Sequence, residues 1–348
     1  MIGVDIMSKI VKFTESAVKF FNIVIHRGVR AYTGYGEIVD GFKEISQAIG
    51  VMQNESRNRK IHDFIMGVRE CNEELNINDE DFLHIIRQLA KDDEVSKTEF
   101  YSKLTISLSN STMDRDERAF YINTLGALTR YEVEFARKLL IYSTFDLRGY
   151  KNKKEQMSSL TSGNDGILLK TLNKLISCGL VFDTRPSGLS GAMGVNYRKT
   201  EQLDKFISYI HQSGSINPIA ISEKEKDKVD LMVITHKLFE NGINDVFLTE
   251  MEELSINAII GSRYTPEDTD LVVKYYIYGK DDRNGNDTSF FLCNGYTEYE
   301  LRKGREVGKF KTNDLIDVDF DTIDINFEEF IKNIGKNIAA FNLVNTDD

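Results

Sequence analysis

The stretch from Asp165 to Thr200, DGILLKTLNKLISCGLVFDTRPSGLSGAMGVNYRKT, constrains the fold more than any other part of the chain. Its leucines and isoleucines recur at helical spacing, which predicts one apolar face packed against a core; they are Leu168, Leu169, Leu172, Leu175 and Ile176. Gly179 follows the last apolar pair, at the place where a left-handed residue commonly ends a helix. The pattern therefore predicts an amphipathic helix that ends just before Gly179.

Two short segments rich in strand-forming residues follow this helix. Leu180–Asp183 and Val195–Arg198 predict two strands around a glycine-rich tip. Upstream, Lys153–Leu160 predicts a short helix, with Ser162–Asn164 as the turn between the two helices. This order of elements predicts a winged helix-turn-helix over residues 146–212, a module that can place a helix in a major groove and a wing on the backbone.

The predicted module is only weakly basic. Between Asp146 and Gln212 there are 10 Lys and Arg against 6 Asp and Glu, a net charge of +4. Because phosphate neutralisation supplies much of the affinity for nucleic acid, this charge leaves both nucleic-acid binding and protein binding open. If a nucleic-acid backbone is bound, we expect the phosphate contacts from the helix and the strands, namely Lys170, Lys174, Arg185, Arg198 and Lys199.

Charge is segregated along the 348 residues, whose total is −11. Residues 213–348 carry a net −12, so nucleic acid would have to approach the middle of the chain.

The three cysteines are far apart and the five histidines show no ligand spacing, so no metal or cofactor is expected and a reducing cytosol fits. No signal peptide and no apolar run of ~20 residues is present, which predicts a cytoplasmic protein without a spanning helix.

Residues 1–145 predict a helical bundle. Apolar residues recur at helical spacing throughout, no proline interrupts them, and Thr129-x-x-Glu132 is a capping-box pattern. The first helix, Ile6–Arg30, has an apolar face too broad for exposure. We expect this face to pack on the bundle, on a partner protein or on a second subunit, and not on a membrane, because no lipidation signal precedes it.

Residues 223–348 predict an α+β domain. Ser222-x-x-Glu225 predicts the start of a helix, while residues 270–279 and 288–301 are rich in strand formers and flank an Asn284–Gly285 turn. A last amphipathic helix begins near Asn326. The predicted fold class is therefore mainly α: a helical bundle, a central winged helix-turn-helix and a C-terminal domain with an antiparallel sheet.

Two acidic segments carry oxygen ligands that could bind a metal ion. In the loop around Asp282, Asn284 and Asn286 the spacing does not match an EF-hand. Alternating aspartates at 317, 319 and 321 would share one strand face, where they could bind magnesium for a nuclease or protect a solvated sheet edge. We favour the edge, because no lysine or second acidic strand accompanies them, and no catalytic residue is assigned.

The segment FYINTLGALTRYE at Phe120–Glu132, followed by LLKTLNKLISCGLV, resembles bacterial abortive-infection proteins of the Abi-alpha type. The resemblance covers about residues 40–210, lacks the glycine-rich N-terminal tract of such proteins and leaves the C-terminal third without a counterpart. It implies a role in phage resistance and no catalytic residues.

The favoured hypothesis is thus a phage-defence binding or sensor protein that contacts nucleic acid or a partner protein. The alternatives are a metal-dependent nuclease with a C-terminal site and a winged-helix transcriptional regulator.

Overall fold

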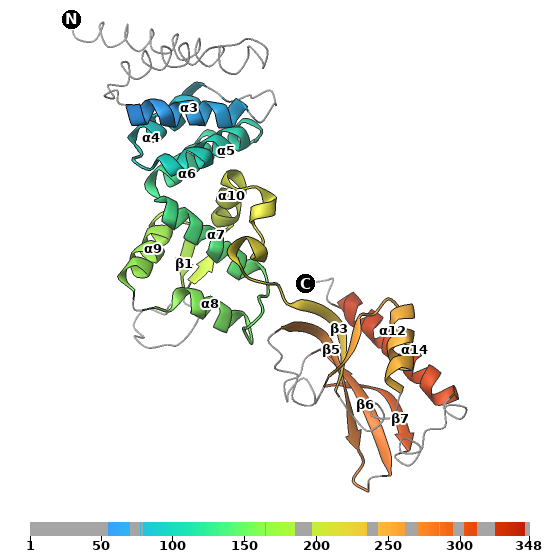
Figure 1. Cartoon of the computed structure of the whole chain (residues 1–348). Helices are drawn as coiled ribbons and strands as arrows, with labels where there is room; N and C mark the ends of the chain where they lie inside the picture. Colours follow the sequence, from blue (N-terminus) through green and yellow to red (C-terminus); the bar gives the residue numbers. More distant parts are fainter. Residues whose placement is uncertain are drawn as a thin grey trace, which may run out of the picture. The chain divides into compact units, whose positions relative to one another are not determined.

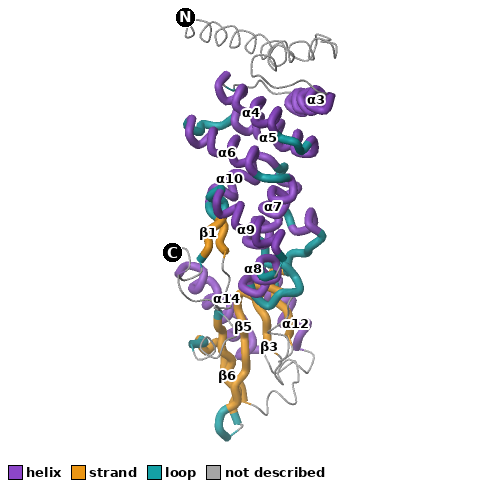
Figure 2. The backbone as a smooth tube through the Cα atoms, turned by 90° about the vertical axis from the view of Figure 1, so that its left-hand side faces the viewer, coloured by secondary structure: helices purple, strands orange, loops and turns teal. Residues whose placement is uncertain are grey.

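The computed structural model describes residues 55–69, 77, 79–163, 165–184, 197–234, 243–261, 270–284, 286–294, 303–311 and 324–344. They form two compact units, one within residues 55–145 and 154–223 and the other within residues 146–153 and 224–344 (Figure 1). Helices dominate the first unit and strands the second (Figure 2). The helix predicted over Ile6–Arg30, with the partners expected for it, lies outside the described residues.

The helices of the first unit follow the apolar periodicity of the sequence. In chain order they are α3 (Glu55–Arg69), α4 (Asp79–Lys91), the 3-10 turn η2 (Val95–Lys97), α5 (Thr98–Ser109), α6 (Arg115–Ala127), α7 (Arg130–Thr144), α8 (Lys153–Thr161), α9 (Gly166–Ser177) and α10 (Glu201–Ile210), with the 3-10 turns η3 (Ser213–Ser215) and η4 (Pro218–Ile221) after α10. The capping box of α7 is confirmed: Thr129 Oγ1 accepts from Glu132 N at 3.2 Å and Glu132 Oε2 accepts from Thr129 N at 2.8 Å.

Helix α10 packs against α5, α6 and α7, so that helices far apart in sequence share one core. The Phe206 ring stacks on Tyr121 of α6, with centroids 6.5 Å apart, and Tyr209 meets Tyr121 edge-on at 5.1 Å. Ser107 Oγ of α5 donates to Tyr209 O at 3.0 Å. Because α10 directly follows the second of two short strands, this packing fixes the end of that strand on the helical core.

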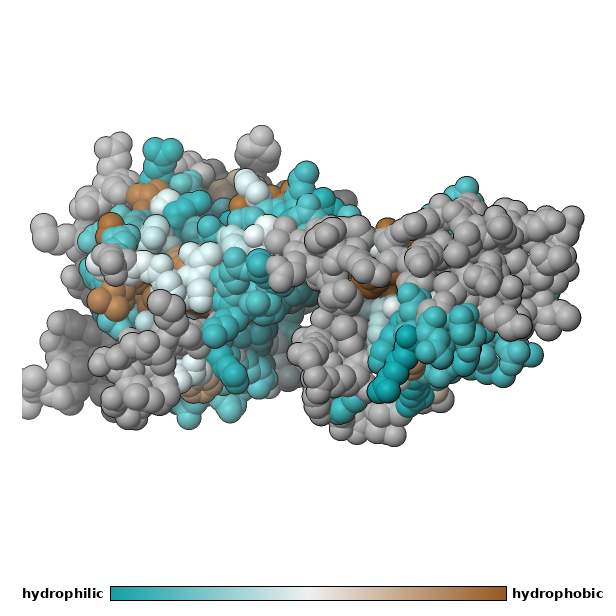
Figure 3. Space-filling view, turned by 90° about the horizontal axis from the view of Figure 1, so that it is seen from below, coloured by the Kyte–Doolittle hydropathy of each residue, from teal (hydrophilic) through white to brown (hydrophobic). Residues whose placement is uncertain are grey.

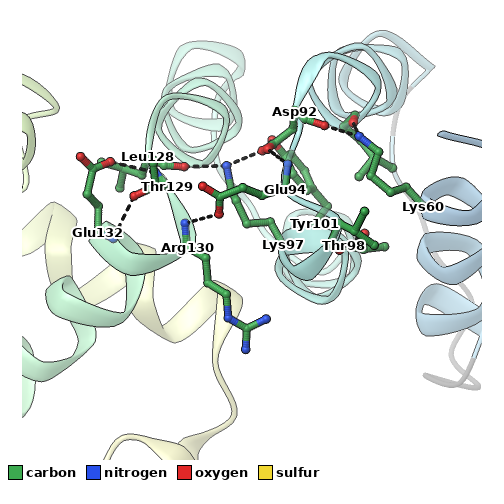
Figure 4. Close-up of polar contacts among 12 residues, drawn as sticks. Lys60, Asp92, Glu94, Lys97, Thr98, Tyr101, Leu128, Thr129, Arg130 and Glu132 are labelled. Atoms are coloured by element: carbon green, nitrogen blue, oxygen red, sulfur yellow. Dashed lines mark hydrogen bonds and ion pairs between the residues drawn. The ribbon is translucent and has the colours of Figure 1, made fainter. Parts of the chain in front are cut away.

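A buried ammonium group joins α4, η2, α5 and α6 (Figure 4). Lys97 is 1% exposed; its Nζ donates to Asp92 Oδ2 and, at 2.6 Å, to Leu128 O, the carbonyl that follows α6. Tyr101 OH donates to the same Asp92 oxygen at 2.9 Å. Lys60 of α3 reaches the Asp92 carbonyl from the other side. The Lys97 ammonium and the Asp92 carboxylate thus connect the end of α4 to the end of α6.

We expect Lys97→Met to lower the free energy of unfolding by roughly 3–5 kcal/mol, because it leaves the Asp92 carboxylate buried without its cation. Chemical denaturation of the full chain measures this change. Arg115→Met is the matched control: it removes a 2.8 Å ion pair with Glu80 whose side chains are 75% and 72% exposed. Loss of such a surface pair costs about 0–1 kcal/mol. Equal effects of the two variants would contradict a structural role for Lys97.

The second unit is a five-stranded mixed sheet, with strand order β4-β3-β5-β6-β7. Its strands are β3 (Asp227–Ile234), β4 (Ala258–Gly261), β5 (Leu271–Asp281), β6 (Asp287–Cys293) and β7 (Arg305–Lys311). β3 pairs in parallel with both β4 and β5, whereas β5–β6 and β6–β7 are antiparallel. Helix α12 (Ile243–Glu253) lies between β3 and β4 in sequence, as a parallel connection requires.

Helices α12 and α14 (Asp324–Val344) share one core with the sheet, on one face of it (Figure 1). The Phe330 ring of α14 lies 5.5 Å from those of Phe290 on β6 and Phe310 on β7, and 6.3 Å from that of Phe247 on α12. Gly308 makes room for it: a Cβ at that position would lie 2.6 Å from Phe330 Cδ2. Phe330 therefore contacts both the sheet and α12 within the core of this unit.

Gly308→Ala should lower the melting temperature of this unit, because the added methyl displaces Phe330 from a packed core, at a cost of about 1–3 kcal/mol. Gly335→Ala in α14 is the control, since its Cβ would meet only Leu254 Cδ1 at 3.4 Å. There alanine should be neutral or stabilising by up to ~1 kcal/mol through helix propensity. Calorimetry on the two variants measures the melting temperatures. An unchanged melting temperature for Gly308→Ala would contradict close packing of Phe330 against Gly308.

The predicted fold class, mainly α with a helical bundle, a winged helix-turn-helix and an antiparallel sheet, is wrong. The structure is mixed α/β, with parallel pairing on both sides of β3, and α10 belongs to the same compact unit as α3–α7. The helix predicted after Ser222 is strand β3, whose C-terminal half is buried on both faces. Such a strand shows a continuous apolar run, which periodicity does not separate from a helix.

Candidate binding surface of helix α9 and the β1–β2 hairpin

Helix α9 is fixed at both ends by local hydrogen bonds. The Asp165 carboxylate caps its first turn by accepting from Ile167 N at 2.9 Å. At its other end Gly179 has φ 71°, which lets Leu180 N donate to Leu175 O at 3.0 Å and turns the chain into the next strand. Thr171, Leu172 and Leu175 are buried. The opposite face, with Lys170 and Asn173, is therefore held rigidly in solvent.

Two three-residue strands follow α9, β1 (Val181–Asp183) and β2 (Tyr197–Lys199), and they pair antiparallel. The register places Phe182 directly opposite Arg198, so these two side chains share the solvent face of the hairpin. Thr200 ties the hairpin to its neighbours: its Oγ1 donates to Gly179 O at 2.9 Å and accepts from Leu203 N to cap α10. The hairpin is thus anchored to the helices before and after it.

The structure distributes the predicted phosphate-binding residues unevenly. Lys170 and Arg198 are exposed, and among the described residues neither forms an ion pair. Lys174 is half-buried, and Lys199 Nζ is engaged by Asp204 Oδ1 at 2.5 Å. Arg185 lies outside the described residues. Of the predicted set, the surface therefore presents two exposed, uncompensated cations and one half-buried cation.

The sequence interpretation missed three exposed apolar side chains on the same elements. Ile167 is 62% exposed and Leu169 51% exposed on α9, and Phe182 is 62% exposed on β1. Hydrophobic residues interspersed among hydrophilic ones also reach the surface in Figure 3. The signal was present, because three consecutive apolar residues at 167–169 span too wide an arc for a single buried helix face. We call Ile167, Leu169, Lys170, Asn173, Phe182 and Arg198 the α9–hairpin surface.

The acidic loop weighed as a calcium site uses its oxygens within the chain. Asp282 Oδ1 accepts from Asn286 N at 2.8 Å, Asp281 Oδ1 accepts from Thr288 Oγ1 at 2.7 Å, and Asp287 pairs with Lys309 at 2.7 Å. Within the described ranges no group of three or more His, Cys, Asp and Glu is placed to hold a metal ion. The aspartates at 317, 319 and 321 lie outside those ranges.

Cys178 and His211 are among the groups of the first unit whose pKa values are shifted. Burial raises the pKa of the Cys178 thiol at the end of α9, with Lys174 opposing the shift. Burial and, to a smaller extent, the nearby cations Arg137, Lys103 and Arg130 lower the pKa of His211 to about 4, while Glu99 opposes the shift. Its Nε2 is buried without a hydrogen-bond partner and its ring lies 5.1 Å from that of Phe100. His211 is therefore a neutral packing residue at the end of α10.

This burial makes stability pH-dependent. An unfolded histidine titrates near ~6.5, above the folded value, so between these values the unfolded chain binds more protons and stability falls as the pH is lowered. We expect the wild-type free energy of unfolding to drop between pH 7 and pH values near 4 more steeply than that of His211→Leu. Urea titrations across this range give the two slopes. If the two proteins lose stability equally as the pH falls, the buried imidazole of His211 does not cause the pH dependence.

Comparisons with known proteins do not identify the chain: no family model matches it, and no curated protein or solved structure matches it significantly. None of the helices in the described ranges combines the length and the apolarity that a bilayer crossing requires. The geometry of the α9–hairpin surface thus carries the functional argument.

Proposed function

We propose that this chain is a cytosolic binding protein of the phage-defence type, not an enzyme, and that it contacts its macromolecular partner through the α9–hairpin surface. The observation that carries the proposal is the exposure of Ile167, Leu169 and Phe182 on elements whose other side is rigidly anchored. Large apolar side chains that are exposed on a helix and on the hairpin that follows it can mark an interaction site. A preorganised helix and hairpin also lose little conformational freedom on binding.

A protein partner fits this surface better than nucleic acid. Each neutralised phosphate contributes to the affinity for nucleic acid. Among the predicted contacts that the structure describes, only Lys170 and Arg198 are both exposed and uncompensated. The carboxylates of Asp165 and Asp183, both exposed, would repel a backbone at the start of α9 and on β1. Apolar anchors beside a few cations are instead typical of protein interfaces.

Nucleic acid is kept as the second candidate because Lys170, Asn173 and Arg198 are exposed donors on one helix and one strand. Asparagine and arginine side chains at such positions can read base edges, and lysine can contact phosphates. With two free cations, the salt dependence of binding should have a slope of about two. A mobility-shift titration in salt separates this candidate from protein binding.

The phage-defence assignment rests on the resemblance carried by Phe120–Glu132. In the structure these residues build the support of the surface: Tyr121, Leu125 and Leu128 are buried, and Phe120 lies beside Gly179 at the end of α9. The segment that carries the resemblance thus belongs to the helices that support the α9–hairpin surface. The surface residues themselves determine the partner.

The function is tested with the double variant Leu169→Asp and Phe182→Asp in bacteria that express the full chain. Both side chains are exposed, so the fold should be kept within ~0.5 kcal/mol, while an apolar interface would be lost. We expect wild type to lower the plating efficiency of at least one phage in a panel, and the double variant to lose most of that protection. Ile219→Asp, at an apolar site 80% exposed on η4, is the matched control.

Equal protection by wild type and the double variant would rule out the α9–hairpin surface as the functional site. Absence of protection by wild type against every phage tested would remove the phage-defence assignment.

A further inference from the structure

Residues 146–153 belong to the second unit, although they join two helices of the first, α7 and α8. Within this segment Leu147 forms an antiparallel bridge with Glu225, which lies just before β3. Two main-chain hydrogen bonds flank the bridge, from Arg148 N to Lys224 O at 2.9 Å and from Lys226 N to Asp146 O at 2.7 Å. We call residues 146–153 the strap.

The strap pairs with one edge of the chain that enters the sheet. Successive amides of a strand point to opposite edges. Asp227 N, at the start of β3, donates to Asp270 O at 3.0 Å on the β5 side, whereas the preceding amide, that of Lys226, donates to the strap. Strand β4 lies on the side of β3 away from β5 and begins to pair only at Leu231. The strap therefore satisfies main-chain groups on the edge that β4 reaches only further along the strand.

Side chains reinforce this attachment in the second unit. Leu147 is fully buried, at 0% exposed. Arg148 Nε donates to Glu225 O at 3.2 Å, and its NH2 pairs with Asp227 Oδ1 at 2.7 Å. The two side chains of this ion pair are 35% and 66% exposed, so the pair contributes little. The main-chain hydrogen bonds and the burial of Leu147 thus provide most of the attachment.

The first unit anchors both chain segments that form the bridge. Gln156 of α8, 1% exposed, donates from Nε2 to Tyr142 O and, at 2.8 Å, to Phe145 O, so the residues on either side of the strap are held together. Tyr142 OH donates to Glu223 Oε1 at 2.7 Å. Glu223 directly precedes the residues that pair with the strap. Tyr142 therefore takes part in both anchors, through its carbonyl and through its hydroxyl.

We propose that the strap is a conformational coupling device, which makes the pairing of residues 224–226 in the second unit depend on the anchors at Tyr142 and Gln156 in the first. The physical reason is loop closure. The anchors keep both partners of the bridge within pairing distance, so the bridge forms at a small entropic cost. Such a coupling free energy is reciprocal, so an event that loosens the bridge also loosens the anchors. A change at the junction of α7 and α8 would thereby alter the sheet of the second unit.

The test is hydrogen exchange of the full chain, followed at the Lys226 amide and in peptides that cover residues 224–230. Tyr142→Phe removes only the hydroxyl that holds Glu223. We expect it to speed exchange of the Lys226 amide about tenfold, since a hydrogen bond to a charged group is lost. Tyr101→Phe is the matched control, because it also removes a tyrosine hydroxyl bound to a carboxylate of the first unit, Asp92, at 2.9 Å. It should leave the Lys226 amide unchanged.

The reciprocal measurement starts in the second unit. Leu147→Ala removes the buried side chain of the strap and should speed exchange of the α8 amides in the first unit several-fold. Ile338→Ala, which truncates a side chain 8% exposed on α14, is the control and should leave α8 unchanged. Unchanged exchange at Lys226 in Tyr142→Phe, or in α8 in Leu147→Ala, would overturn the coupling. An equal effect of Tyr101→Phe at Lys226 would also overturn it, because the stability of the whole first unit, and not the strap, would then control the bridge.

Discussion

A buried lysine determines how the helices of the first unit meet. The ammonium group of Lys97 has left water entirely, and such a group is tolerated only when its charge and its hydrogen bonds are satisfied. Asp92 supplies the charge and Leu128 O supplies an acceptor. Those partners directly follow α4 and α6, so one side chain connects the ends of two helices next to the start of α7.

Helices α7 and α10 connect the buried Lys97–Asp92 pair to the α9–hairpin surface. Helix α7 starts at the capping box beside Leu128, and α9 packs against it. The aromatic contacts of Tyr121 hold α10, and α10 in turn holds the end of the β1–β2 hairpin through Thr200. A binding surface carried on elements anchored in this way is rigid, and rigidity is what allows exposed apolar side chains to discriminate between partners.

In the second unit the constraint is the mixed pairing of the strands. Its sheet is parallel around β3 and antiparallel beyond β5, which requires both a helical crossover and a hairpin. The crossover leaves α12 with one buried face and one face in solvent. The exposed face is acidic and partly apolar.

Three local features could be predicted from the sequence: the capping box at Thr129, the end of α9 at Gly179 and the hairpin of β5 and β6. Each follows from hydrogen bonding or backbone conformation within a few residues. Three other features could not be predicted: β3 is a strand with two parallel neighbours, Lys199 pairs with Asp204, and Leu169 is exposed. These three depend on which segments lie opposite one another in space, and periodicity along one segment does not contain that information.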